Sequence, residues 1–295
     1  MALRLLRTAP RASRPCTAFV LSGGGSLGAL QAGMLRALYE REICPDLLVG
    51  TSVGSVNAGF IASRPPTVAT ADELASVWLS LQRDDVFPVS VRALIGGLRS
   101  KRDHLVPDHA LRHLVRSHVE LTQLEDATIP LHIVCYDLTG GREVRLSTGP
   151  AREAIVASCS IPGILPPVRI ADRYLVDGGV ANGTPISHAI ALGAQRVYVL
   201  STSDRSRIQH RPDGSALDAA ANALRVLLST RLEIDLERYS NQVELTVLPA
   251  ANESHVQPSD FDHASELIAE ALASARQLLD DAERPLTGRA RATAS

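Results

Sequence analysis

The segment Gly50-Thr51-Ser52-Val53-Gly54 has the residue types and spacing of a serine nucleophile, in the pattern G-x-S-x-G. It follows a predicted strand, Asp46–Gly50, and precedes a predicted helix of small residues, Val53–Ala62. In that setting the serine lies on a tight strand-to-helix turn, and the flanking glycines avoid the clashes that Cβ atoms would make there. The amino end of the helix also favours the negative charge that develops during nucleophilic attack. Ser52 is therefore predicted to be a nucleophile in acyl transfer, with Gly50 and Gly54 supporting the turn.

A second glycine-rich turn, Gly23-Gly24-Gly25-Ser26-Leu27-Gly28, separates the predicted strand Thr17–Leu21 from an amphipathic helical pattern that begins at Ser26. Consecutive glycines expose backbone N–H groups that suit an anion or an oxyanion. We predict that the oxyanion hole is formed by Gly23, Gly24, Gly25 and Ser26, with Gly28 supporting the loop. Because one good oxyanion donor contributes about 2.7–4 kcal/mol, this loop would be a major catalytic element.

The same turn also fits the dinucleotide-binding pattern G-x-G-x-x-G. That pattern expects an acidic residue at the end of the following strand, where it binds the ribose hydroxyls. Here the following strand ends in Gly50-Thr51-Ser52, and the nearby acid, Asp46, lies at its beginning. Nucleotide binding is a weaker alternative to the hydrolase interpretation.

The third motif is Asp177-Gly178-Gly179, after the apolar run Tyr174-Leu175-Val176. Taken alone, it would be an ordinary turn. All three motifs, however, follow the carboxyl ends of predicted strands, which is the edge where ligands bind in open parallel sheets. Because neighbouring strands lie about 4.8 Å apart, three such loops can meet at one site. Asp177 is thus predicted to lie at one site with Ser52, supported by Gly178 and Gly179.

A free aspartate, with a pKa of about 3.9, is a poor base for a serine hydroxyl. Burial would raise that pKa, so the pair needs a largely dry site. An alternative is a triad, because Ser52, Asp177 and His188 follow the chain order of α/β-hydrolases. His188 falls in a helix predicted to begin near Ile186, where a structural or surface role is more common.

In their order and context, these motifs resemble those of the patatin-like phospholipases, from about Ala18 to Leu200. The segments Ala157–Gly163 and Gly183-Thr184-Pro185 are similar to the corresponding segments of bacterial members of that family. The resemblance implies a three-layer α/β/α fold with a mainly parallel sheet and a Ser–Asp dyad without histidine, in which Ser52 is the nucleophile and Asp177 the base. It also implies calcium-independent hydrolysis of lipid acyl esters. Leu27 stands where many members carry Arg or Lys, so an electropositive side chain for a phosphate head group is missing there.

Composition excludes other classes of function. A net charge of −2 gives no electrostatic reason to expect nucleic-acid binding. The four cysteines form no C-x-x-C pair, and His109 and His113 lack the acid of an H-E-x-x-H motif, so we expect no metal and no cofactor. No apolar run approaches the roughly 18 residues of a membrane span. We therefore expect a cytoplasmic protein, with a possible peripheral contact at a membrane surface.

The pattern predicts one domain over residues 16–282, a disordered basic tail over 1–15 and a frayed tail over 283–295. A less regular segment, Asp84–Pro107, interleaves apolar and basic residues, and it is either a lid or a packed excursion. A catalytically weak lipid-binding or regulatory module is the alternative from another functional class. The remaining strands are expected at Leu131–Tyr136, Glu143–Ser147, Arg173–Val176, Arg196–Leu200 and Val243–Leu248. The remaining helices are expected at Thr70–Gln82, Asp108–His118, Ala151–Ala157, Leu217–Tyr239 and Phe261–Leu279.

Overall fold

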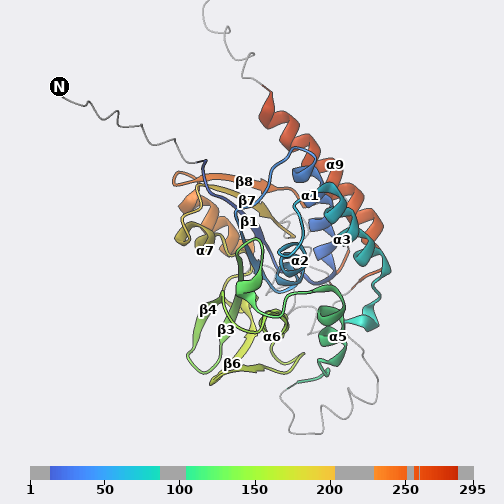
Figure 1. Ribbon diagram of the computed structural model, residues 1–295, viewed down its shortest axis with the longest axis vertical. Helices are drawn as coiled ribbons and strands as arrows, with labels where there is room; N and C mark the ends of the chain where they lie inside the picture. The colour runs from blue at the N-terminus through green and yellow to red at the C-terminus, as the bar shows by residue number, and fades with distance from the viewer. Residues whose placement is uncertain (1–13, 87–103, 203–228, 251–255, 259, 285–295) are drawn as a thin grey trace, which may run out of the picture.

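A computed structural model describes residues 14–86, 104–202, 229–250, 256–258 and 260–284 (Figure 1). Most of the tail predicted over 1–15, of the segment Asp84–Pro107 and of the tail predicted over 283–295 lies outside the described residues. So does the first half of the helix predicted over Leu217–Tyr239, whose remainder is helical over 229–239.

The core is one eight-stranded sheet in the order β5-β6-β3-β2-β1-β7-β8, with β4 paired to β3. The five neighbouring strands β3, β2, β1, β7 and β8 are parallel to one another. Strands β4 and β6 pair with β3 in antiparallel fashion, and β5 pairs with β6 in the same way. The sheet is therefore mostly parallel, as predicted. Its strands are β1 (Thr17–Leu21), β2 (Leu47–Thr51), β3 (Leu131–Asp137), β4 (Arg142–Leu146), β5 (Val168–Ile170), β6 (Arg173–Asp177), β7 (Arg196–Leu200) and β8 (Glu244–Leu248).

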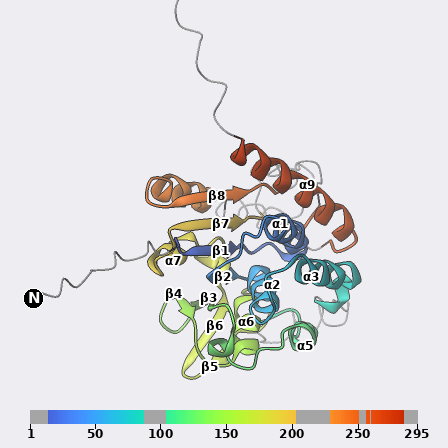
Figure 2. The same cartoon turned by 45° about the horizontal axis from the view of Figure 1, so that its top comes forward.

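Helices cover both faces of the sheet, which makes the three layers predicted from the resemblance (Figures 1 and 2). Alternate residues of the central strands supply the two cores. Phe19 and Leu21 pack on one face, whereas Ala18 and Val20 pack on the other. The first face carries α1 (Ala29–Tyr39), α2 (Val53–Ile61), α3 (Val68–Ser80), α5 (His109–His118), α6 (Ala151–Ser158) and α9 (Ala264–Glu283). The second face carries α7 (Ile186–Ala191) and the helical segment 229–239.

Strands β2 and β6 meet end to end along one side of β3. Thr51, the last residue of β2, pairs with Val134, and Asp177, the last residue of β6, pairs with Cys135. Strand β4 pairs with β3 over both of these positions, so it occupies the opposite side. We expected the three motifs to follow strands of a parallel sheet, but β6 is antiparallel to β3. Asp177 therefore comes close to Ser52 because the two strands meet end to end.

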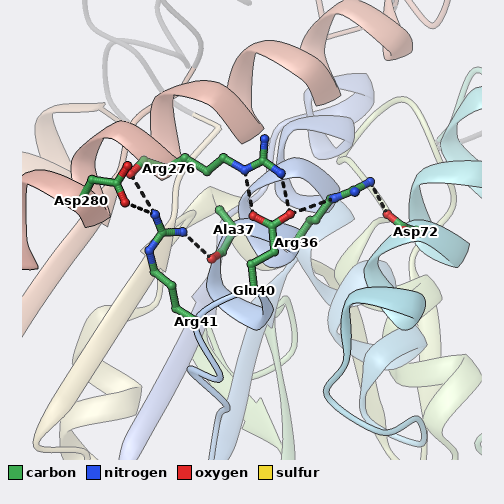
Figure 3. Close-up of polar contacts among 7 residues, drawn as sticks. All are labelled: Arg36, Ala37, Glu40, Arg41, Asp72, Arg276 and Asp280. Carbon is green, nitrogen blue, oxygen red and sulfur yellow. Dashed lines mark hydrogen bonds and ion pairs between the residues drawn. The ribbon is translucent and has the colours of Figure 1, made fainter.

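Helices α1 and α9 are in close contact, and charged side chains line their exposed edge (Figure 3). A Cβ atom on Gly33 of α1 would lie 2.3 Å from the Ile268 carbonyl oxygen of α9, so the helices approach too closely for a side chain there. Arg276 donates to both oxygens of Glu40, at 2.8 and 2.5 Å, and Arg36 extends the network to Asp72 at 2.8 Å. Arg41 continues the same row and contacts Asp280. These pairs join α9 and α3 to the helix that follows the glycine-rich loop.

Most predicted elements lie within a few residues of the observed ones, and the helix expected near Ile186 is present as α7. The three-residue strand β5 was not predicted, because a strand this short and partly exposed leaves no alternating pattern. Within the described part of the chain, no helix combines the length and the apolar character needed to span a bilayer.

Candidate active site

Ser52 lies on the sharp turn between β2 and α2, with φ +54° and ψ −130°. This left-handed conformation is rare for a residue with a side chain and persists only where the surroundings enforce it. A Cβ atom on Gly50 would lie 2.6 Å from the Gly54 carbonyl oxygen, and one on Gly54 would lie 2.1 Å from the Leu21 carbonyl oxygen. Both glycines are therefore required by the backbone that surrounds the turn.

The Ser52 hydroxyl donates a hydrogen bond to Asp177 Oδ2 at 2.6 Å. The other carboxylate oxygen, Oδ1, accepts the Gly179 amide at 2.7 Å. Asp177 is buried, with 6% of its surface exposed. Desolvation raises the pKa of Asp177 to about 6, although the hydrogen bonds from Ser52 and Gly179 favour the ionised form. A carboxylate with this pKa can accept a proton near neutral pH.

Gly178 and Gly179 shape the turn that follows Asp177. A Cβ atom on Gly178 would lie 2.4 Å from the Val134 carbonyl oxygen of β3, so the chain crosses that strand at close range. One on Gly179 would lie 3.0 Å from Asp177 Oδ1. Small residues here let the Gly179 amide reach the carboxylate.

The glycine-rich loop lies directly against Ser52. A Cβ atom on Gly23 would be 3.0 Å from Ser52 Cβ, and one on Gly28 would be 2.5 Å from Val53 Cγ2. The Gly23 amide donates to the Gly183 carbonyl at 2.9 Å, and the Ser26 amide donates to the Pro258 carbonyl at 2.8 Å. These two of the four predicted oxyanion donors are thus already engaged.

The backbone N–H groups of Gly24 and Gly25 donate no hydrogen bond to any of the described residues. A Cβ atom on Gly24 would lie 2.2 Å from Thr202 Oγ1, and one on Gly25, at φ +60°, would lie 2.3 Å from the Pro258 carbonyl oxygen. Neither position tolerates a side chain without a shift of its neighbours. Gly25 lines the same cavity as Ser52, so the loop brings an amide without an acceptor among the described residues to that cavity.

A buried polar network fixes the loop to the neighbouring helices. The Asn57 side chain of α2 donates to the Gly28 carbonyl at 3.0 Å and to Gln31 Oε1 at 2.8 Å, and it accepts Trp78 Nε1–H at 3.1 Å. Gln31 in turn donates to the Ser22 carbonyl at 2.9 Å. Because Asn57 and Gln31 are fully buried, each bond replaces lost contact with water. The network fixes the glycine-rich loop relative to α2, the helix that follows Ser52.

Ser52 lines an apolar cavity. The empty volume of this cavity, including the part open to solvent, is about 710 Å³. Its walls come mainly from α2, α3 and α5, with Phe261 near α9, and its few polar members include Ser52, Asn57 and His118. Burial is the main cause that lowers the pKa of His118, so the neutral form of this histidine is favoured at the cavity wall. The apolar lining residues include Val56, Phe60, Leu74, Val77, Trp78, Leu111, Leu114, Ile161 and Leu165. Such a lining suits a hydrocarbon chain.

His188 bonds to Glu143 through Nε2, and Glu143 also accepts the Asn182 side-chain amide at 2.8 Å. Glu143 lies on β4 and His188 on α7, the helix that covers the opposite face of the sheet from α2. The structure thus brings Ser52, Asp177 and the glycine-rich loop together, whereas His188 belongs to a separate polar cluster. No group of three potential metal ligands occurs among the described residues.

Sequence reasoning did not find several residues that support the site. At the end of α6, the Ser158 hydroxyl accepts the Ser52 amide, and the Ser160 backbone carbonyl accepts the Asp177 amide. The Thr202 hydroxyl, just after β7, donates to the Gly23 carbonyl. Thr202 follows the carboxyl end of a parallel strand, which is a signal that could have marked it. Ser158 and Ser160 lie in the segment Ala157–Gly163, which is similar to bacterial family members, but that similarity assigns no role to either serine.

The fold and site define an α/β protein with a serine on a strand-to-helix turn, a buried aspartate beside it and a glycine-rich loop. The profile described as "Patatin-like phospholipase" matches residues 19–190, more than half of the chain. The chain belongs to the patatin-like phospholipase family.

Similar proteins include lysophospholipase NTE1 of Mycosarcoma maydis, which is 30% identical over 67% of this chain and 10% of its own length. An uncharacterised NTE family protein of Mycobacterium tuberculosis is 29% identical over 71% of this chain and 54% of its own length. The chain thus spans about half or less of these relatives. Among solved structures, VipD from Legionella pneumophila aligns with a TM-score of 0.43 and 13% identity, over 90% of this chain and 67% of that protein.

Proposed function

We propose that the protein is a serine acyl-ester hydrolase of lipid substrates, with Ser52 as nucleophile and Asp177 as its proton acceptor. The observation that carries the proposal is the 2.6 Å hydrogen bond to the buried Asp177 carboxylate from Ser52 Oγ, and Ser52 lines an apolar cavity. A nucleophile, a base with a suitable pKa and room for an apolar chain are the parts that ester hydrolysis through an acyl-enzyme needs.

In the proposed mechanism, Ser52 Oγ attacks the ester carbonyl carbon while its proton passes to Asp177 Oδ2. The carbonyl oxygen gains a negative charge, which the amides of Gly24 and Gly25 stabilise. We narrow the oxyanion hole to these two residues because the amides of Gly23 and Ser26 donate elsewhere. Collapse of the tetrahedral intermediate breaks the bond to the leaving alcohol, which takes the proton from Asp177. Water then attacks the acyl-enzyme, with Asp177 again accepting the proton. The second tetrahedral intermediate collapses by breaking the bond to Ser52 Oγ, which takes the proton back from Asp177 and releases the carboxylic acid.

The cavity favours a substrate with a single uncharged acyl chain beside the ester. No Arg or Lys occurs among the described residues that line it, and Leu27 is packed in the core with 7% exposure. The name lysophospholipase, carried by a relative, fits a substrate with one acyl chain. We therefore propose that the acyl chain, more than the head group, determines substrate choice. Peripheral contact with a membrane surface stays a prediction.

A panel of substrates tests the proposal: p-nitrophenyl esters of increasing chain length, lysophosphatidylcholine and a diacyl phosphatidylcholine. We expect turnover of the esters and of the lysophospholipid, with a rate that rises with chain length and is lost in Ser52→Ala. If folded protein binds these lipids with no turnover above Ser52→Ala, the chain is the lipid-binding module instead.

A further inference from the structure

The end of helix α6 contacts the backbones of both residues of the proposed dyad. The Ser52 amide donates to Ser158 Oγ at 2.9 Å, and the Asp177 amide donates to the Ser160 carbonyl at 2.9 Å. The two proposed catalytic residues are 125 positions apart in the chain. A segment of three residues therefore fixes both of them from one side.

The direction of each hydrogen bond at Ser158 is defined by its partners. Ser158 Oγ donates a hydrogen bond to the Val134 carbonyl of β3 at 2.6 Å, so it acts as the acceptor in its hydrogen bond with the Ser52 amide. Ser158 is fully buried, so water cannot replace either bond. A buried amide without an acceptor is costly, and the left-handed backbone of Ser52 needs such enforcement. One hydroxyl thus joins α6, β3 and the nucleophile turn.

We propose that Ser158 is a positioning residue that holds the Ser52 backbone so that its hydroxyl reaches Asp177. This inference rests on the proposed hydrolase function and adds a residue that supports it. Ser158 touches no reacting atom. It acts through the position of the nucleophile, and a displacement of about 1 Å at a reacting group can cost about 100-fold in rate.

Ser160, two residues beyond the end of α6, provides a matched control. It is also fully buried, and its hydroxyl donates back to the Val156 carbonyl of α6 at 2.9 Å. Its contact with Asp177 uses the backbone carbonyl, which Ser160→Ala retains. Ser158→Ala and Ser160→Ala therefore remove the same group from equally buried sites, but only the first removes a bond to the nucleophile.

The test measures ester turnover of the full chain in both alanine variants, with folding checked by thermal unfolding. We expect Ser158→Ala to lower kcat about 10- to 100-fold with KM within about threefold of wild type. Ser160→Ala should keep kcat within about threefold. The acid limb of the pH profile adds a readout that a loss of stability would not move. Because the Ser52 hydrogen bond favours ionised Asp177, its loss raises the pKa of Asp177 and moves the limb to higher pH in Ser158→Ala only.

Equal kcat values and unchanged pH profiles in the two folded alanine variants would overturn the positioning role. If Ser158→Ala does not fold, Ser158→Cys and Ser160→Cys are compared, since a thiol keeps a weak donor and acceptor in place. We then expect Ser158→Cys to be at least threefold slower than Ser160→Cys, and equal rates would overturn the role. Failure of wild type to turn over any ester refutes the hydrolase proposal itself, whereas wild-type turnover with equal variants refutes only the role of Ser158.

Discussion

Replacing Asp177 with asparagine should abolish activity and yet stabilise the fold at neutral pH. The pKa of the Asp177 carboxyl is raised from 3.8 to about 6 by burial, so the fold disfavours the ionised form. Since each pKa unit corresponds to about 1.36 kcal/mol, this cost is about 3 kcal/mol when the group is charged. Asparagine removes the charge, and its amide can still accept the Gly179 N–H and donate to Ser52 Oγ. We expect a gain of about 1–3 kcal/mol in the free energy of unfolding at pH 8.

The pH dependence of this gain follows from the direction of the pKa shift. A carboxyl whose folded pKa lies above its unfolded value binds more protons in the native state between the two values. Wild-type stability therefore falls as pH rises from about 3.8 to about 6, and the full cost is present above about 6. The difference between Asp177→Asn and wild type should vanish below about pH 4.

Urea unfolding of both proteins at pH 8 and pH 4, with ester turnover measured in parallel, tests this reasoning. Turnover should fall at least 100-fold, because a general base contributes about 10²–10⁴-fold. Asp137→Asn is the control, since Asp137 is also buried but accepts two backbone amides and pairs with Arg173 at 3.8 Å. It should bring no gain in stability. An Asp177→Asn protein that is no more stable than wild type at pH 8, or that keeps its activity, would refute the account of Asp177.

Three other expectations concern activity. The kcat/KM of wild type should fall about tenfold for each pH unit below about 6 and level off above it, because protonated Asp177 cannot accept the Ser52 proton; a profile that is flat down to pH 4 would contradict this. Val56→Trp places a larger side chain in the cavity beside Ser52. This variant should lower turnover of a long-chain p-nitrophenyl ester at least tenfold more than turnover of p-nitrophenyl acetate. An equal effect on both esters would exclude the cavity as the acyl site. His188→Ala should keep kcat within about threefold, since His188 bonds to Glu143 on the other face of the sheet; a thousandfold loss would establish a triad.

The sequence was enough to predict the elements that carry the site. The period of the apolar residues changes where strands end and helices begin, and the glycines around Ser52 and Asp177 mark turns that only small residues can make. Pattern alone could not predict that β6 is antiparallel, because a strand's direction depends on its partner and not on its own residues. It also could not show that Gly23 and Ser26 use their amides elsewhere, since both acceptors, Gly183 and Pro258, are distant in the chain.

The supporting contacts of the site were hidden for the same reason. Serine is a common residue, and nothing in the sequence around Ser158 distinguishes a hydroxyl that bonds to the backbone of α6 from one that bonds to the turn carrying Ser52. The distinction arises when α6 packs against β3 and α2. Composition and spacing therefore predicted which residues could react, whereas only the packed fold shows what holds them.

The most direct test of the central claim is the mass spectrum of the protein after reaction with a fluorophosphonate at pH 8. A hydroxyl activated by Asp177 should form one adduct per chain, on the peptide that contains Ser52. The adduct should be absent in Ser52→Ala and should form at least 100-fold more slowly in Asp177→Asn. Folded wild-type protein that forms no adduct, or an adduct that persists in Ser52→Ala, would contradict the assignment of Ser52 as the nucleophile.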